Sequence, residues 1–97
     1  MGTLIFKNIV NIKDEYGGDP VQVWIDDLMD DEREQLRGAL EALRAGSMDG
    51  LTHIHGKIYE LSVRSRSVLL LYISIDLENS TLNLIKGLKI DFSQPEL

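Results

Sequence analysis

The chain has 97 residues, a formal net charge of −6 and no cysteine. Its length fits a single domain over residues 1–97, because one hydrophobic core typically serves about 50 to 200 residues. The lack of cysteine excludes disulfides, thiolate nucleophiles and cysteine-ligated metal sites. No signal-like segment opens the chain, and the longest apolar run, about 68–73, is far too short to span a membrane. We therefore expect a soluble cytoplasmic protein that does not associate with membranes.

The negative charge lies in the first half of the chain. Residues 1–49 contain eleven acidic and five basic residues, whereas residues 50–97 contain five of each. Phosphate contacts dominate the affinity of proteins for nucleic acids, so the acidic half argues against generic RNA binding. The electrostatic attraction of RNA to a protein depends on local as well as total charge. A basic patch in the second half of the chain would therefore still attract RNA. The cations available for it are Lys57, Arg64, Arg66, Lys86 and Lys89.

The pattern predicts a strand and then a helix at the start of the chain. Loose alternation of apolar residues over 3–12 is typical of a strand, and 15–19 is predicted to be a loop. Asp19 as N-cap and Pro20 at the first helical position then begin a short amphipathic helix that extends to Leu28.

A second, longer helix is predicted next. Either Asp30 or Asp31 can cap it, and Gly46 is a natural terminator. The apolar residues at helical spacing are Leu36, Ala39, Leu40 and Leu43. The charged residues on the other faces, predicted to be solvated, are Arg33, Glu34, Arg37, Glu41 and Arg44. Together the two helices suggest a helical hairpin packed on a sheet.

Three strands complete the predicted fold, after a connecting loop over residues 47–55. They cover residues 57–64, 67–75 and 81–90, with turns at 65–66 and 76–80. The middle strand is almost continuously apolar, which predicts a central strand covered on both faces. The element order β-α-α-β-β-β predicts a two-layer α+β domain with helices on one face of an antiparallel sheet.

The segment from Gly56 to Tyr72 resembles the central hairpin of RelE/HigB-type toxins, most closely the phage Gp49-like branch. In that superfamily a strand reading roughly Leu-Tyr-Glu-Leu-Arg-Val-Arg turns into one reading roughly Tyr-Arg-Val-Leu-Tyr. Here Ser62 stands at the first arginine position, and leucine fills the arginine position of the second strand. The matching residues are Tyr59, Glu60, Leu61, Val63, Arg64 and Tyr72.

Three further segments resemble the same family in the same order. Residues 19–28 resemble its first helix, residues 36–46 its leucine-rich second helix and residues 84–89 its final strand. The resemblance therefore covers nearly the whole chain and implies a RelE-like fold.

The resemblance implies the toxin of a type II toxin–antitoxin system. Such a toxin is a ribosome-dependent, metal-independent mRNA endoribonuclease that needs no cofactor. Its partners would be an antitoxin protein, the ribosome and mRNA. In this chemistry the ribose 2′-OH attacks the adjacent phosphate, so the protein must supply a proton acceptor, a proton donor and cations for the developing charge.

Arg64 and Lys86 are the candidate catalytic residues. Arg64 matches the family's strand arginine, and a guanidinium can clamp a phosphate with two hydrogen bonds. The alternative is a solvated arginine at a strand end. Lys86 stands where relatives often have histidine. The candidate RNA-binding residues are Lys57, Arg66, Lys89 and His55.

Several of these residues have a simpler structural interpretation. Lys86 and Lys89 also fit charges that keep an edge strand from pairing with another chain. His53 and His55 lack further ligands nearby, so solvated imidazoles are favoured over a metal site. Glu60 matches a family glutamate that holds neighbouring arginines in place. Periodicity places the aromatic residues Trp24 and Tyr59 in the helix–sheet core rather than against RNA bases.

A second interpretation is a RelE-fold protein that has lost cleavage activity and acts as a protein-binding or regulatory module. One alternate set of the leucines at residues 69–71 would face away from the helices. Uncovered apolar surface of this kind is typical of a docking site for a partner, such as an antitoxin helix or a second subunit. This interpretation also predicts homodimers formed through the sheet face.

Overall fold

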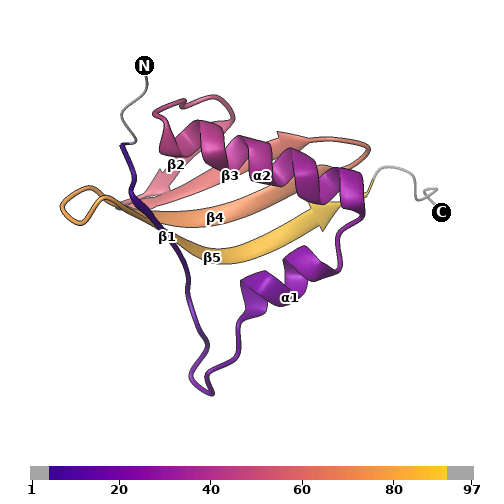
Figure 1. Ribbon diagram of the computed structural model, residues 1–97, viewed down its shortest axis with the longest axis horizontal. Helices are drawn as coiled ribbons and strands as arrows, with labels where there is room; N and C mark the ends of the chain where they lie inside the picture. The colour runs from indigo at the N-terminus through magenta and orange to yellow at the C-terminus, as the bar shows by residue number, and fades with distance from the viewer. Residues whose placement is uncertain (1–4, 92–97) are drawn as a thin grey trace.

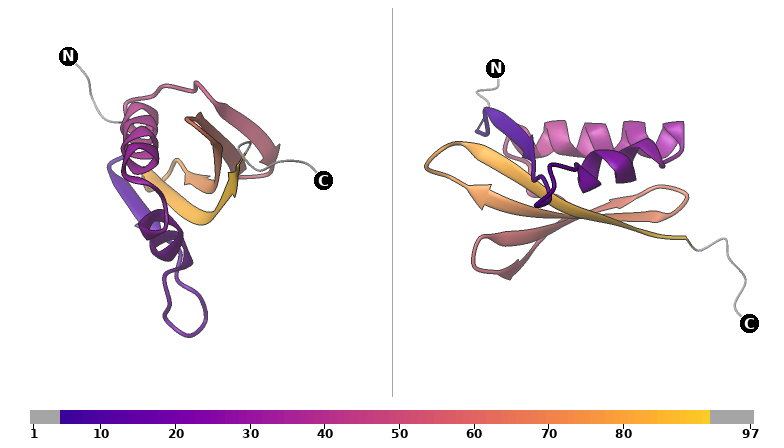
Figure 2. Two further views of the ribbon diagram at one scale, coloured as in Figure 1. Left: turned by 90° about the vertical axis from the view of Figure 1, so that its right-hand side faces the viewer. Right: turned by 90° about the horizontal axis from the view of Figure 1, so that it is seen from below.

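Two helices lie on one face of a five-stranded sheet in the computed structural model, which describes residues 5–91 (Figure 1). The strand order is β1-β5-β4-β3-β2, and the two further views show both helices on the same side of the sheet (Figure 2). The predicted α+β class is therefore confirmed. The elements are β1 (Asn8–Asn11), α1 (Pro20–Asp26), α2 (Asp30–Arg44), β2 (Leu51–His55), β3 (Ile58–Arg64), β4 (Val68–Asp76) and β5 (Thr81–Ile90).

The sheet differs from the predicted antiparallel arrangement in two respects. Strand β1 pairs with β5 in parallel, so the sheet is mixed. Residues 51–55 form β2, antiparallel to β3, where a connecting loop was predicted. The first strand is also shorter than predicted, and residues 3–4 of the prediction lie outside the described part of the chain. The helical layer and the three antiparallel strands β3, β4 and β5 agree with the prediction.

The core lies between the helices and the sheet. Its sheet side is formed by alternate residues of β3, β4 and β5, and its helix side by the apolar stripes of α1 and α2. Trp24 and Tyr59 pack against it and are half-buried, as their periodicity predicts. The buried members are Phe6, Val21, Leu28, Leu36, Leu40, Leu43, Leu61, Val63, Leu69, Leu71, Ile73, Ile75, Leu82 and Leu84.

The central strand β4 is covered on one face, whereas the sequence predicted cover on both. Leu69, Leu71 and Ile73 are fully buried under the helices. On the opposite face Leu70 and Tyr72 are only half-buried by the described residues. Apolar side chains on neighbouring strands shield each other there, which explains why this strand reads as apolar throughout.

The two helix N-termini are capped in different ways. Asp19 caps α1 as predicted, and its carboxylate accepts a hydrogen bond of 3.0 Å from the Gln22 amide. Helix α2 instead has Met29 at the N-cap, so the predicted cap at Asp30 or Asp31 is wrong. The carboxylate of Glu32 reaches back and accepts a 2.9 Å hydrogen bond from the Met29 amide, which satisfies one of the donors left free at a helix start.

Candidate functional site on the open face of the sheet

On the sheet face away from the helices, here called the open face, strand pairing sets three successive rows of residues between the middle of β4 and its start. The first row crosses four strands from β2 to β5, and the next two cross from β3 to β5. The rows are Thr52–Glu60–Tyr72–Lys86, then Ser62–Leu70–Leu88, then Arg64–Val68–Ile90. The predicted facing of β3 is confirmed, because Leu61 and Val63 are buried under the helices while Ser62 and Arg64 are exposed.

Four aliphatic residues of β4 and β5 form a compact group on this face, here called the apolar block: Val68, Leu70, Leu88 and Ile90. Leu88 lies opposite Leu70, and Ile90 lies opposite Val68. Leu88, in the interior of β5, is 45% exposed, and Ile90, the last residue of the strand, is 41% exposed. Val68 is buried but does not belong to the main core. The block is therefore a second apolar cluster on the side of the sheet that no helix covers.

A tyrosine and a glutamate are paired beside the apolar block. The Tyr72 hydroxyl donates a hydrogen bond to the Glu60 carboxylate, and this bond, with partial burial, raises the pKa of Tyr72 above its usual 10.0. The phenol is accordingly protonated at neutral pH and can donate but not act as a phenolate base. The resemblance implied that Glu60 holds arginines in place, whereas in the structure its partner is Tyr72.

The pairing predicts a pKa change that can be measured. In Glu60→Gln the negative charge is removed, so the pKa of Tyr72 should fall towards 10.0. A raised native pKa stabilises the fold below pH 10.0, and this contribution is lost as the pH rises through the native value. The alkaline loss of stability should therefore be smaller in the variant. Ultraviolet titration of tyrosinate measures the pKa, and Tyr72→Phe assigns the transition; an unchanged transition in Glu60→Gln would refute the pairing.

The two candidate catalytic residues are both exposed on the open face but lie apart. Arg64 is on β3 and Lys86 is on β5, with β4 between them. Along the strand direction they are two positions apart, counting only residues that face the same side of the sheet. With about 4.8 Å between strands and about 6.7 Å between same-face residues, their backbones are on the order of 15 Å apart. The apolar block occupies the space between them. They do not form a single cationic site in this arrangement.

Arg64 also lines a shallow hollow of about 470 Å³ between α2 and the end of β3. Two acidic residues, Glu34 and Asp49, line the same hollow together with Gly38 and Gly50. Carboxylates that line the same hollow oppose the approach of a phosphate, whereas a peptide with mixed charges meets no such penalty.

The other predicted RNA-binding residues are dispersed. Arg66, in the β3–β4 turn, pairs with Asp31 of α2 at 2.8 Å. Lys57 is exposed in the β2–β3 turn, and its charge contributes to the lowered pKa of Asp76, whose largest cause is a hydrogen bond from Asn79. His55 is exposed at the end of β2, opposite Ile58. Lys89 lies on the helix side of the sheet. The structure therefore does not bring this set together.

A buried polar cluster on the helix side was missed by the sequence patterns, here called the Glu32 cluster: Glu32, Ser67 and Lys89. The Glu32 carboxylate is fully buried; it accepts a 2.6 Å hydrogen bond from Ser67 and is paired with Lys89 at 3.0 Å. Burial pushes its pKa up most strongly, but the bonds from Ser67, the Met29 amide and Lys89 together outweigh it, and the pKa lies below its usual value.

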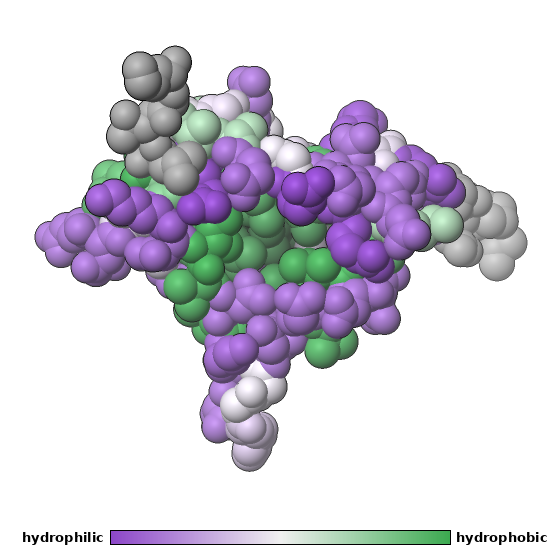
Figure 3. Space-filling view, viewed as in Figure 1, coloured by the Kyte–Doolittle hydropathy of each residue, from purple (hydrophilic) through white to green (hydrophobic). Residues whose placement is uncertain are grey.

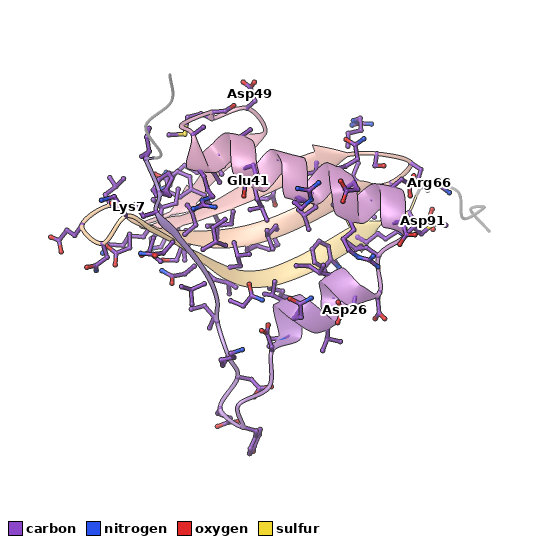
Figure 4. All side chains as sticks on the ribbon, viewed as in Figure 1. Lys7, Asp26, Glu41, Asp49, Arg66 and Asp91 are labelled. Atoms are coloured by element: carbon purple, nitrogen blue, oxygen red, sulfur yellow. The ribbon has the colours of Figure 1, made fainter. Side chains whose placement is uncertain are left out.

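The Glu32 cluster joins the start of α2 to the β3–β4 turn and to the end of β5. Arg66 and Asp91 mark this end of the molecule (Figure 4). Because all its buried side-chain polar atoms are partnered, we assign it a structural role.

Within residues 5–91, no three histidine, cysteine, aspartate or glutamate side chains are grouped so that they could hold a metal ion. His53 instead packs its ring against Tyr59, with centroids 4.9 Å apart, and its Nε2 lies 2.8 Å from the Gly56 carbonyl oxygen. In the same part of the chain, no helix is both long and apolar enough to cross a membrane.

Comparison with known proteins found no matching family model, no significantly similar curated protein and no significantly similar solved structure. The similarity to RelE/HigB-type toxins accordingly rests on the residues quoted above.

Proposed function

We propose that this chain is a RelE/HigB-like domain that binds a partner protein through the open face of its sheet. The observation that carries the proposal is the exposed apolar block, with Arg64 and Lys86 at opposite corners. Exposed apolar groups that are contiguous and rimmed by polar residues are typical of protein interaction sites. The two cations favour a partner whose apolar segment is flanked by acidic residues. An antitoxin-type protein that lays a helix or strand across the sheet has this chemistry.

Leu88→Glu is expected to weaken partner binding at least about tenfold, because a charge placed in the apolar block must be desolvated on docking. Leu88 is already partly exposed, so the fold should tolerate the change. Leu77→Glu is the matched control, since Leu77 is an exposed leucine in the β4–β5 turn, away from the block. The partner to test is the product of an adjacent helix-turn-helix or ribbon-helix-helix reading frame, with affinity measured by calorimetry. Equal binding by wild type and Leu88→Glu would contradict the proposal.

A second candidate is a metal-independent, ribosome-dependent mRNA endoribonuclease. It is favoured by the family resemblance and by the exposure of Arg64 and Lys86 on one face. The separation of these two cations and the carboxylates that line the same hollow as Arg64 favour the binding module instead.

Induced expression separates the two candidates. If the chain cleaves translated mRNA, expression should arrest growth, and Arg64→Ala should relieve the arrest while Lys7→Ala, at an exposed cation before β1, should not. If the chain is a binding module, we expect that neither the wild type nor Arg64→Ala cleaves mRNA when added to a translating extract. Arrest that depends on Arg64 would replace the binding proposal with the endoribonuclease.

A further inference from the structure

An ordered loop projects from the body of the molecule between β1 and α1, at the bottom of Figure 1. It carries Tyr16, which at 89% is the most exposed large apolar side chain in the described part of the chain. Single exposed apolar side chains are common on protein surfaces and do not by themselves indicate a binding site. The rigidity of the loop decides how much entropy Tyr16 would lose on binding.

Four hydrogen bonds hold the tip of the loop. The Asp14 carboxylate accepts from the Tyr16 amide at 2.9 Å and from the Gly18 amide at 2.7 Å. The Asp14 amide donates to the Gly18 carbonyl at 2.8 Å, and the Gly17 amide donates to the Asp14 carbonyl at 3.1 Å. Gly17 has φ of +82°, a conformation that favours glycine. Tyr16 is therefore presented by a preorganised turn, which lowers the entropy cost of binding through it.

The same chain carries an apolar hollow that fits an aromatic side chain. It has a volume of about 260 Å³ and lies between α1 and α2, where Ile25, Leu36 and Leu40 form its apolar floor. Arg33 and Arg37 of α2 form its rim. The space-filling view shows apolar surface between the polar surfaces of the two helices (Figure 3).

One charge beside the tyrosine is opposite in sign to one at the rim of the hollow. Glu15 is exposed next to Tyr16 at the loop tip. Arg37 uses Nε and Nη2 for its pair with Glu34, and its guanidinium has further N–H donors for a second carboxylate. Arg33 is already engaged, since it donates to three backbone carbonyls around the end of α1 and to Asp30. Arg37 is thus the rim residue able to receive Glu15.

We propose that Tyr16 of one copy of this chain inserts into the α1–α2 hollow of a second copy, with Glu15 beside Arg37. Tyrosine is among the residues that most often dominate binding energy, and it does so in desolvated apolar pockets. If each copy inserts its loop into the other, the contact closes into a twofold dimer rather than an open chain. The dimer uses the helix-bearing side of the molecule, so it is independent of the partner proposed for the open face.

Sedimentation velocity from about 10 μM to about 1 mM, a range that covers weak complexes, tests the dimer. The wild type should dimerise with rising concentration, Tyr16→Phe should dimerise nearly as well, and Tyr16→Ala should weaken the dimer at least about tenfold. All positions changed are exposed, and circular dichroism checks that each variant folds. A wild type that stays monomeric, or a Tyr16→Ala variant that dimerises equally well, would overturn the proposal.

A charge exchange tests the placement of the loop in the hollow. Glu15→Arg and Arg37→Glu should each weaken the dimer, because each puts like charges side by side. The double variant Glu15→Arg, Arg37→Glu restores opposite charges and should recover most of the affinity. Losses that simply add in the double variant would show that Tyr16 docks elsewhere and would overturn the hollow as its site.

Discussion

Glu32→Ala is expected to lower the free energy of unfolding by about 3 kcal/mol, the low end of the range of about 3 to 5 kcal/mol for breaking a buried ion pair. The change removes the acceptor of Ser67, of the Met29 amide and of Lys89 at once. Lys89 is 28% exposed and can turn partly towards water, which places the loss at the low end. Thermal unfolding should show it as a fall in Tm of about 12 to 24 °C, at about 4 to 8 °C per kcal/mol.

Two further variants separate the ion pair from a general effect of losing a glutamate. Glu34→Ala removes an exposed glutamate two residues further along the same helix, and it should change stability little. Glu32→Leu combined with Lys89→Met leaves no charge buried and should recover part of the loss. A loss in Glu34→Ala as large as that in Glu32→Ala would contradict the role of the Glu32 cluster.

The same cluster predicts a dependence of stability on pH. The native pKa of Glu32 lies below its usual 4.5, so its contribution is fully present above pH 4.5 and is lost as the pH falls through the native value. The stability difference between wild type and Glu32→Ala should therefore shrink in acid. Denaturant unfolding at a series of pH values measures it, and a difference that stays constant down to strong acid would refute the assignment.

Two features set by neighbouring residues were predicted correctly from the sequence. The Asp19–Pro20 helix start depends on the backbone within one turn, and the structure confirms it. The alternation of β3 identified its buried face correctly, because side chains on a strand point to opposite faces in turn. Local chemistry decides both features, so local patterns are sufficient to predict them.

Features that depend on distant residues were not predictable in this way. Strand β2 contains two histidines and a threonine and is exposed along most of its length, so no apolar pattern identified it. The parallel pairing of β1 with β5 joins residues 8–11 to 81–84 and leaves no local trace. Glu32 is one of three acids in the first turn of α2, where a negative charge is favourable, and no local pattern distinguishes it from Asp30 and Asp31. Its burial depends on Ser67 and Lys89, which are 35 and 57 residues away.

A single irregularity in β5 decides which residues form the candidate site. Leu82 and Leu84 face the helices, so strict alternation would send Lys86 and Leu88 to the same side. The register shifts between Tyr72 and Ile73 of β4, where Leu84 and Lys86 are successive partners and the intervening residue is left out of the pairing. This bulge exchanges the two faces beyond it. Lys86 and Leu88 thereby reach the open face, while Gly87 and Lys89 reach the helix side.

The second large effect is expected at Gly87, which the bulge places beneath Trp24 of α1. A Cβ atom at this position would overlap the indole carbons Cδ2 and Cε3 of Trp24, so Gly87→Ala forces the ring or the whole of α1 away from the sheet. Overpacking of this kind costs about 1 to 3 kcal/mol and occasionally more. We expect denaturant unfolding to show a loss in the upper part of that range, since the indole ring is rigid and α1 packs chiefly on β5.

Replacing Gly38 by alanine should have the opposite effect on stability. Gly38 is exposed in the middle of α2, and a Cβ there would meet nothing within 4 Å. Alanine stabilises a helix by about 1 kcal/mol relative to glycine, so Gly38→Ala should raise the Tm.

Trp24→Leu combined with Gly87→Ala makes room for the added methyl group. The double variant should therefore lose less stability than the sum of the losses in the two single variants. If Gly87→Ala stabilises the protein as Gly38→Ala does, α1 does not pack against β5 through this contact, and the bulge does not set the faces of the sheet as described.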